Sequence, residues 1–318
     1  MDKTNFDLVI LGAGPAGMAA GIYACRKQID TLIISENVGG QMTWSSGIEN
    51  YPGYIFISGT DLVFKFEEHL TRFGVPFIFT KIVKLTRSED IFTIEADDGR
   101  VFNARAVIIA TGKSPRMLDV PGEREYTGKG VTYCATCDAP LFEGMDVAIV
   151  GGGNSGLDAA IQLMRICPKV YLIERLDKPG GDEIVQQQIR EASNVEMLLR
   201  TEITEIHGNG FVDSINVRNI DTGEMRKLDV KGVFVEVGLV PNSKIVKDLV
   251  RLNQYGEIPV DCAARTGVPG LYAAGDVTNV PEKQIVVAAG DGAKAALGAY
   301  SYLIRLPAYK DWGKKAKC

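Results

Sequence analysis

The 318-residue chain is poor in histidine and cysteine, and it has no long apolar run and no block of charges of one sign. Its apolar stretches are shorter than the roughly 20 residues that a membrane-spanning helix requires. A net charge of −5 with mixed signs argues against a nucleic-acid-binding protein, which normally presents a basic face. Six cysteines are too few for a disulfide scaffold. We therefore expect neither a membrane nor a nucleic acid as a partner.

The composition instead indicates a folded protein with two domains of ordinary size. Apolar residues make up 46% of the chain, which is enough to bury a core, so disorder is not expected. The apolar stretch near the N-terminus leads directly into a glycine motif, and we interpret it as a first strand rather than a secretory signal. The predicted location is therefore the cytoplasm, where thiols are kept reduced.

Four cysteines and both histidines are isolated in the sequence. Cys25, Cys167 and Cys262 lie in apolar or helix-like surroundings and are predicted to be packing residues. Cys318 is the last residue and is given no role. His69 and His207 are predicted to be ordinary core or surface residues.

One pattern occurs twice in the chain. FDLVILGAGPAGMAAGIYACRKQIDTLIISE (6–36) and MDVAIVGGGNSGLDAAIQLMRICPKVYLIE (145–174) each contain a β-like run, G-x-G-x-x-G, a helix-like segment and a second run ending in an acid. The first glycine permits a tight turn, the second lets a pyrophosphate approach, and the third lets the helix pack against the strand. A single glycine motif is weak evidence, but two complete copies predict two dinucleotide-binding βαβ units.

The arrangement of these units follows from a second repeat. ARAVIIATG (104–112) is similar to VKGVFVEVGLVPN (230–242), and both are strands ending in glycine whose following residues are predicted to pair as a hinge. The predicted fold class is α/β, with two Rossmann-like dinucleotide-binding domains, the second inserted in the first. The predicted boundaries are residues 1–114 and 243–318 for the first domain and 115–242 for the second.

The two remaining cysteines form the motif C-x-x-C-D at Cys134, Cys137 and Asp138. A structural zinc site needs about four ligands, and the sequence offers neither a second cysteine pair nor suitably spaced histidines, so no metal is predicted. A packing role is another alternative, but the spacing favours a redox pair. A helix starting near Cys137 would lower a thiol pKa. Asp138 is predicted to transfer protons or to cap that helix.

In order, the chain carries GAGPAG, GGQ, ENYPG, ATG, C-x-x-C-D, GGGNSG and AAGD. Over nearly its whole length it thereby resembles the flavin-disulfide oxidoreductases, and more narrowly the low-molecular-weight thioredoxin reductases and the flavoprotein subunit of alkyl hydroperoxide reductase. The resemblance implies a homodimer with FAD in the first unit and NADH or NADPH in the inserted unit. It implies electron flow through FAD and the cysteine pair to thioredoxin or a similar dithiol protein.

The resemblance also assigns individual residues. The implied FAD contacts are Gly12, Gly14, Ala16, Gly17, Glu36, Gly40, Gln41, Asn50, Thr111, Gly275, Asp276, Gln284 and Ile285. The implied nicotinamide-nucleotide contacts are Gly151, Gly153, Asn154, Ser155, Gly156, Glu174 and Arg175. Cys137 would exchange electrons with FAD, Cys134 would attack the partner's disulfide, and Asp138 would protonate the departing thiolate. Ala139 departs from the family, which often has glycine there.

The electron donor is indicated by the residues after the second unit's last strand. Family members that use NADPH carry His-Arg-Arg there to hold the 2′-phosphate, whereas this chain has Glu174–Arg175–Leu176. An acid suits the free 2′-hydroxyl of NADH, which is therefore favoured over NADPH. The missing basic residues also fit an enzyme fed by reduced ferredoxin. Two further alternatives are a disulfide-forming oxidase that uses oxygen and a flavin-binding protein without catalysis.

Overall fold

The chain forms two compact units in a computed structural model that describes residues 3–45 and 47–306. The first unit consists of Met1–Thr43, Thr60–Ser114 and Val240–Cys318. The second consists of Trp44–Gly59 and Pro115–Leu239. The second unit is thus nested within the sequence of the first. The segment Trp44–Gly59, which the sequence assigned to the first domain, groups with the second unit.

The first unit contains the predicted βαβ motif, formed by β1 (Asn5–Leu11), α1 (Pro15–Arg26) and β2 (Thr31–Ser35). Its sheet has the order β3-β2-β1-β6-β5-β4, and β17 also pairs with β6. β1 pairs in parallel with β2 and β6, while β4, β5 and β6 pair antiparallel. The other elements here are η1 (Gly40–Trp44), α2 (Gly59–Thr71), β3 (Phe77–Phe79), β4 (Ile82–Ser88), β5 (Ile91–Ala96), β6 (Val101–Ile109), η3 (Lys244–Val246), β17 (Leu271–Ala273), η4 (Gly275–Val277) and α6 (Ile285–Leu303).

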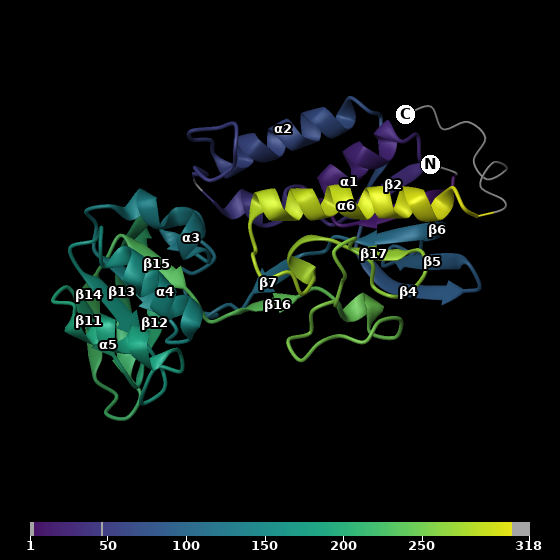
Figure 1. The fold of residues 1–318 in the computed structure, drawn as a ribbon. Coiled ribbons are helices and arrows are strands. Elements are labelled where there is room, and N and C mark those ends of the chain that lie inside the picture. The colour runs from purple at the N-terminus through teal and green to yellow at the C-terminus, as the bar shows by residue number, and fades with distance from the viewer. Residues whose placement is uncertain (1–2, 46, 307–318) are drawn as a thin grey trace. The chain divides into compact units, whose positions relative to one another are not determined.

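The central strands of this sheet are apolar along nearly their whole length. In β1, every residue from Phe6 to Leu11 is buried, which is typical of a parallel strand covered on both faces. Figure 1 shows α1 and α6 side by side, and Gly292 of α6 packs against the backbone of Ala16, within the glycine motif of the first unit. Apolar side chains of this sheet form one hydrophobic core with residues such as Val246, Ile258 and Val277.

The second unit contains the other predicted βαβ motif, formed by β9 (Val147–Val150), α4 (Asn154–Leu163) and β10 (Val170–Ile173). Its five-stranded sheet is parallel, in the order β11-β10-β9-β15-β8. An antiparallel meander, β12-β13-β14, covers one side, and the sequence patterns did not predict it. The other elements are β8 (Val131–Thr132), α3 (Ala135–Asp138), η2 (Ala139–Phe142), α5 (Glu183–Glu191), β11 (Val195–Leu198), β12 (Thr201–Asn209), β13 (Phe211–Asn219), β14 (Met225–Asp229) and β15 (Gly232–Val235).

Two short strands carry the chain between the units. β7 (Lys113–Pro115) and β16 (Leu239–Pro241) form a two-stranded sheet, which confirms the predicted pairing. The Thr111 hydroxyl donates to the carbonyl oxygen of Asn242 at 2.7 Å, and the Asn242 amide donates back to the Thr111 carbonyl oxygen at 2.9 Å. These bonds hold the two crossing segments side by side.

Each unit has its own apolar interior. In the second unit one core lies between the parallel sheet and the meander, and another lies between the sheet and helices α4 and α5. Within residues 3–45 and 47–306, the structure contains no helix with the length and apolarity needed to cross a membrane.

The close packing of α1 and α6 gives a stability prediction. A Cβ added at Gly292 would lie 2.0 Å from the Ala16 carbonyl oxygen, so Gly292→Ala must push the two helices apart. We expect it to lower the free energy of unfolding by about 1–3 kcal/mol, measured by urea denaturation followed by circular dichroism. Gly290→Ala is the matched control on the same helix. A Cβ there meets no atom of the described chain within 4 Å, so this variant should be neutral or slightly stabilised. Equal losses in both would contradict the packing argument.

Candidate functional site

The two glycine motifs have the same backbone geometry. Gly12 and Gly151 have φ of +107° and +111°, values that side chains rarely tolerate. A Cβ added at Gly17 would lie 1.9 Å from the Gly12 carbonyl oxygen, and one at Gly156 would lie 1.8 Å from the Gly151 carbonyl oxygen. The first and third glycines of each motif are therefore required by the fold itself.

The middle glycines differ, because they face open space. Among the described residues, a Cβ at Gly14 or Gly153 would meet no atom within 4 Å. Gly14 and Gly153 are also the N-cap residues of α1 and α4, whose first N–H groups donate to no capping side chain in the described structure. Ala16 lies in the first turn of α1, and Asn154 and Ser155 lie in the first turn of α4. Both loops therefore fit a pyrophosphate on a helix N-terminus.

The acid of the second unit lies against its glycine loop. The Glu174 carboxylate accepts hydrogen bonds from the Gly152 N–H and, at 2.9 Å, from the Leu176 N–H. The next residue, Arg175, is exposed and pairs with Glu202 at 3.4 Å. The structure thus brings together the glycines and the acid that the sequence assigned to a nicotinamide nucleotide, and it directs Arg175 to a surface ion pair.

The predicted FAD residues of the first unit lie on several segments. The side-chain amide of Gln41 donates to the Asp276 carboxylate at 3.1 Å, so these residues meet although they are far apart in sequence. Gln284 is the N-cap residue of α6, which begins at Ile285 as predicted. Glu36 is exposed directly after β2, Gly40 begins η1, Gly275 begins η4, and Thr111 bonds to Asn242. Asn50 lies in Trp44–Gly59 and groups with the second unit.

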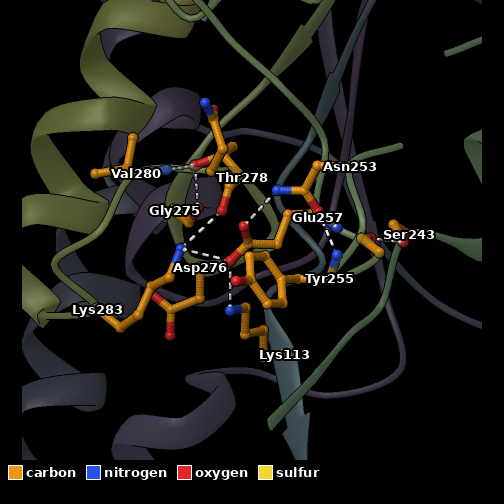
Figure 2. Close-up of polar contacts among 12 residues, drawn as sticks. Lys113, Ser243, Asn253, Tyr255, Glu257, Gly275, Asp276, Thr278, Val280 and Lys283 are labelled. Atoms are coloured by element: carbon orange, nitrogen blue, oxygen red, sulfur yellow. Dashed lines mark hydrogen bonds and ion pairs between the residues drawn. The ribbon is translucent and has the colours of Figure 1, made fainter. Parts of the chain in front are cut away.

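A cluster of partly buried charges lies near Asp276, and Figure 2 shows the contacts that join it at Glu257. One oxygen of Glu257 contacts the Lys113 ammonium at 2.7 Å and the Lys283 ammonium at 3.5 Å. The other oxygen accepts from the Asn253 side-chain amide at 2.8 Å. The exposed fractions of the Lys113, Glu257 and Lys283 side chains are 11%, 13% and 19%, so this network is largely shielded from water.

The cluster sets the charge around the carboxyl of Asp276. Burial raises the pKa of Asp276, while the nearby Lys283 and Lys113 oppose this rise. Burial and then Lys113 lower the pKa of Lys283. Burial alone would raise the pKa of Glu257, but hydrogen bonds from Lys113 and Asn253 hold this pKa below the usual value. Lys113, Glu257 and Lys283 were not predicted from the sequence, because no motif links residues so distant along the chain.

In the second unit, Cys134 and Cys137 form a disulfide with their Cα atoms 5.3 Å apart. Asp138 is 5% exposed and follows Cys137 directly. Its carboxylate accepts from the Thr132 hydroxyl and, at 2.7 Å, from the Ser45 hydroxyl. Burial raises the pKa of Asp138, and these two hydrogen bonds oppose the rise. Its side chain caps no helix in the described structure, so its contacts favour the proton-transfer interpretation.

The expected helix beside the cysteines is a single turn, α3, with Cys134 as its N-cap residue. Its first N–H group, that of Ala135, donates to the Glu236 carboxylate at 3.1 Å. The pKa of Glu236 is raised to about 7, mainly by burial; the Ala135 N–H opposes the rise, and Asp158 adds to it. Glu236 was not predicted from the sequence, because an acid after an apolar strand carries no spacing signal.

Of the isolated cysteines, Cys25 and Cys167 are buried as predicted. The prediction for Cys262 was wrong: it is exposed, because its segment forms a surface turn instead of an apolar element. Cys318 lies outside the described residues. His69 is exposed and His207 is partly buried beside Asn216. Within the described chain, no group of three His, Cys, Asp or Glu side chains is arranged to hold a metal ion.

Comparison with known proteins places these features in a family. Residues 6–292 match the family described as Pyridine nucleotide-disulphide oxidoreductase, and the chain belongs to it. The chain is 41% identical over 96% of its length to the NADH dehydrogenase of Ferdinandcohnia aciditolerans, and 41% identical over 95% to an alkyl hydroperoxide reductase subunit from Escherichia coli. It covers 59% of each of these two proteins, so it spans about three fifths of the length of such relatives.

Solved structures give the same family and fold. The crystal structure of thioredoxin reductase from Streptococcus pyogenes superimposes with a TM-score of 0.90 at 39% identity. This match covers 95% of the present chain and 99% of the other. The predicted α/β fold with two dinucleotide-binding domains is therefore confirmed.

The charge cluster in Figure 2 gives a second stability prediction. Glu257→Gln leaves Lys113 and Lys283 without their shared countercharge, and we expect a loss of about 2–4 kcal/mol in the free energy of unfolding. Glu95→Gln is the control, because it removes one partner of the exposed Lys84–Glu95 pair and should cost about 0–1 kcal/mol. Urea denaturation of both variants measures the difference. A loss at Glu257 no larger than that at Glu95 would show that the cluster is not a buried charge network.

Proposed function

Because the chain belongs to the pyridine nucleotide-disulphide oxidoreductase family, we propose that it is a flavin-dependent disulfide reductase acting on thioredoxin or a similar dithiol protein. In this proposal electrons pass from a reduced nicotinamide nucleotide through FAD to the Cys134–Cys137 pair, and then to the partner. The observation that carries it is a redox-type disulfide within a unit that also has a dinucleotide-binding glycine loop.

The residues of the first unit fit FAD. The open loop at Gly14 would hold the pyrophosphate, and Asp276, already oriented by Gln41, would accept a hydrogen bond from the ribityl hydroxyls. The N-terminus of α6 at Ile285 would direct its partial positive charge at the isoalloxazine. When bound, the flavin supplies two-electron chemistry between a hydride donor and a disulfide.

The cysteine centre has the groups that disulfide exchange needs. Cys137 would exchange electrons with the flavin, and Cys134, as a thiolate, would attack the disulfide of the partner protein. Asp138 would protonate the departing thiolate. Its raised pKa lets it keep a proton at higher pH than an ordinary carboxyl, and the Thr132 and Ser45 hydroxyls fix its orientation.

NADH is the proposed donor. Glu174 is held against the glycine loop, where its carboxylate suits a ribose 2′-hydroxyl and repels a 2′-phosphate. Arg175 pairs with Glu202, which leaves it less able to offer a competing positive charge to NADPH. A relative named NADH dehydrogenase agrees with this choice. Reduced ferredoxin is the second candidate donor, because the basic residues of the NADPH pattern are missing.

Further parts of the proposal rest on the family alone. A homodimer, a cytoplasmic location and rotation of the inserted unit about the β7–β16 hinge remain predictions. Rotation would let one flavin serve both the nicotinamide and the disulfide in turn.

The first functional prediction concerns the cysteine pair. Cys134→Ser and Cys137→Ser should each abolish thioredoxin reduction and keep FAD bound, since all the proposed flavin residues except Asn50 lie in the other unit. Asp138→Asn should slow turnover roughly 100-fold if proton transfer limits the rate. Steady-state reduction of thioredoxin, with flavin absorbance as the control for folding, measures all three. Near-normal turnover in either serine variant would remove the pair from the mechanism. Oxygen consumption with a dithiol substrate would instead indicate a disulfide-forming oxidase.

The second functional prediction concerns the donor. Wild-type protein should have a higher kcat/KM for NADH than for NADPH. Glu174→Arg should shift the ratio of the two kcat/KM values toward NADPH by about tenfold or more. The variant replaces repulsion of the 2′-phosphate by a charge-assisted hydrogen bond to it. Asp177→Asn is the control, since it changes one charge in the same loop and leaves the Glu174 contacts in place. A wild-type preference for NADPH would disprove the assignment. Flavin reduction by ferredoxin but by neither nucleotide would move the donor to ferredoxin.

A further inference from the structure

The redox-active turn at Cys134–Cys137 has two acidic neighbours, the buried Asp138 and the partly buried Glu236, and the reaction proposed above uses only Asp138. Asp138 follows Cys137 in the chain, whereas Glu236 follows β15 and reaches the other end of α3. Glu236 also lies against the nucleotide loop, since a Cβ added at Gly151 would lie 2.5 Å from the Glu236 carbonyl oxygen. One residue therefore contacts both the redox-active turn and the loop of the dinucleotide site.

The contact with α3 changes the electrostatics of the cysteines. Free N–H groups at a helix N-terminus stabilise a thiolate and lower the pKa of a cysteine placed there. In α3 the first of these groups, the Ala135 N–H, is already bound to the Glu236 carboxylate at 3.1 Å. Because α3 has a single turn, its dipole is small and offsets little of the negative charge of Glu236. The Glu236 carboxyl therefore occupies a donor that would otherwise favour a thiolate, and when ionised it places a negative charge there.

We propose that Glu236 is a positioning residue of the disulfide centre, holding the first turn of α3 and restraining thiolate formation once the disulfide opens. The inference rests on the proposed redox role of the pair, but it holds for any two-electron reductant. When the S–S bond breaks, two electrons enter, one sulfur takes a proton to become a thiol, and the other is left as a thiolate. If Glu236 is ionised at that moment, two negative charges lie close together, and either the sulfur or the carboxyl takes up a second proton.

The charged groups around Glu236 are compatible with this coupling. Asp158 on α4 raises its pKa, the Ala135 N–H on α3 lowers it, and burial raises it most, to about 7. On the redox-active turn, Asp138 is acidic and Cys134 and Cys137 are joined in the disulfide, so this turn brings no positive charge to Glu236. Among the described residues of the second unit, no cation forms an ion pair with this carboxyl.

The test measures thiolate formation directly. The full-length protein is reduced with dithiothreitol, freed of reductant, and alkylated with iodoacetamide between pH 5 and pH 9, with Cys134, Cys137 and Cys262 resolved by peptide mass spectrometry. In Glu236→Gln, which retains an acceptor for the Ala135 N–H, the pH profile of Cys134 or Cys137 should move to lower pH. Alkylation at pH 6.5 should be about three- to tenfold faster than in wild type.

Two controls separate this effect from a structural one. Exposed Cys262 should keep the same profile in every variant. Asp158→Asn removes an exposed charge on α4 and should shift the cysteine profiles less than Glu236→Gln does. A role in folding alone would change the plateau rate and leave the pH of half-maximal alkylation unchanged. An unshifted or alkaline-shifted profile in Glu236→Gln overturns the proposal.

A second measurement covers the case in which Glu236→Gln does not fold. In wild-type protein, coupling between the carboxyl and the thiols predicts an alkylation profile broader than a single titration. A single-step profile at both cysteines would also overturn the proposal. The experiment uses neither nucleotide nor thioredoxin, so its outcome is independent of the donor and partner assignments. A protein that fails to reduce thioredoxin can still show this coupling. A protein that reduces thioredoxin can also lack it.

Discussion

Both dinucleotide units depend on one steric constraint. In each glycine motif, the carbonyl oxygen of the first glycine lies so close to the α-carbon of the third glycine that no side chain fits there. At Gly17 and Gly156 a side chain would lie within 2 Å of that oxygen, so each helix can begin directly against its strand only because no side chain is present. The helices α1 and α4 then begin at Gly14 and Gly153, which face open space in the described structure and have no capping side chain. Backbone packing therefore sets the geometry of both glycine loops.

The carboxyls that are shielded from water in the two units are stabilised in different ways. In the first unit, Glu257 stays ionised because two ammonium groups and an amide surround it, and the same lysines reduce the effect of burial on Asp276. In the second unit, Asp138 and Glu236 accept hydrogen bonds from hydroxyls and a backbone N–H, which are weaker partners than a cation. Their pKa values therefore stay raised, which suits groups that exchange protons beside a disulfide.

The sequence predicts the features that arise from short-range patterns. Both βαβ units, the start of α6 and the C-x-x-C-D centre each follow from residues close together in the chain, and the paired hinge strands follow from the likeness of 104–112 to 230–242. Glu236, Lys113 and Lys283 could not be found in this way, because their roles come from partners brought near by folding. Cys262 shows the opposite error, since an apolar context in sequence became an exposed turn in the structure. Trp44–Gly59 also departs from expectation, because contacts such as that between Ser45 and Asp138 group it with the second unit.

The nesting of one unit inside the other has a consequence for synthesis of the chain. The half of β6 at Val107–Ile109 pairs on one side with β1 and on the other with β17, whose residues come after the entire second unit. At the usual pace of translation, on the order of ten seconds pass between these two strands leaving the ribosome. During that time the second unit can fold completely, while the nascent sheet of the first presents an unpaired apolar edge to its surroundings.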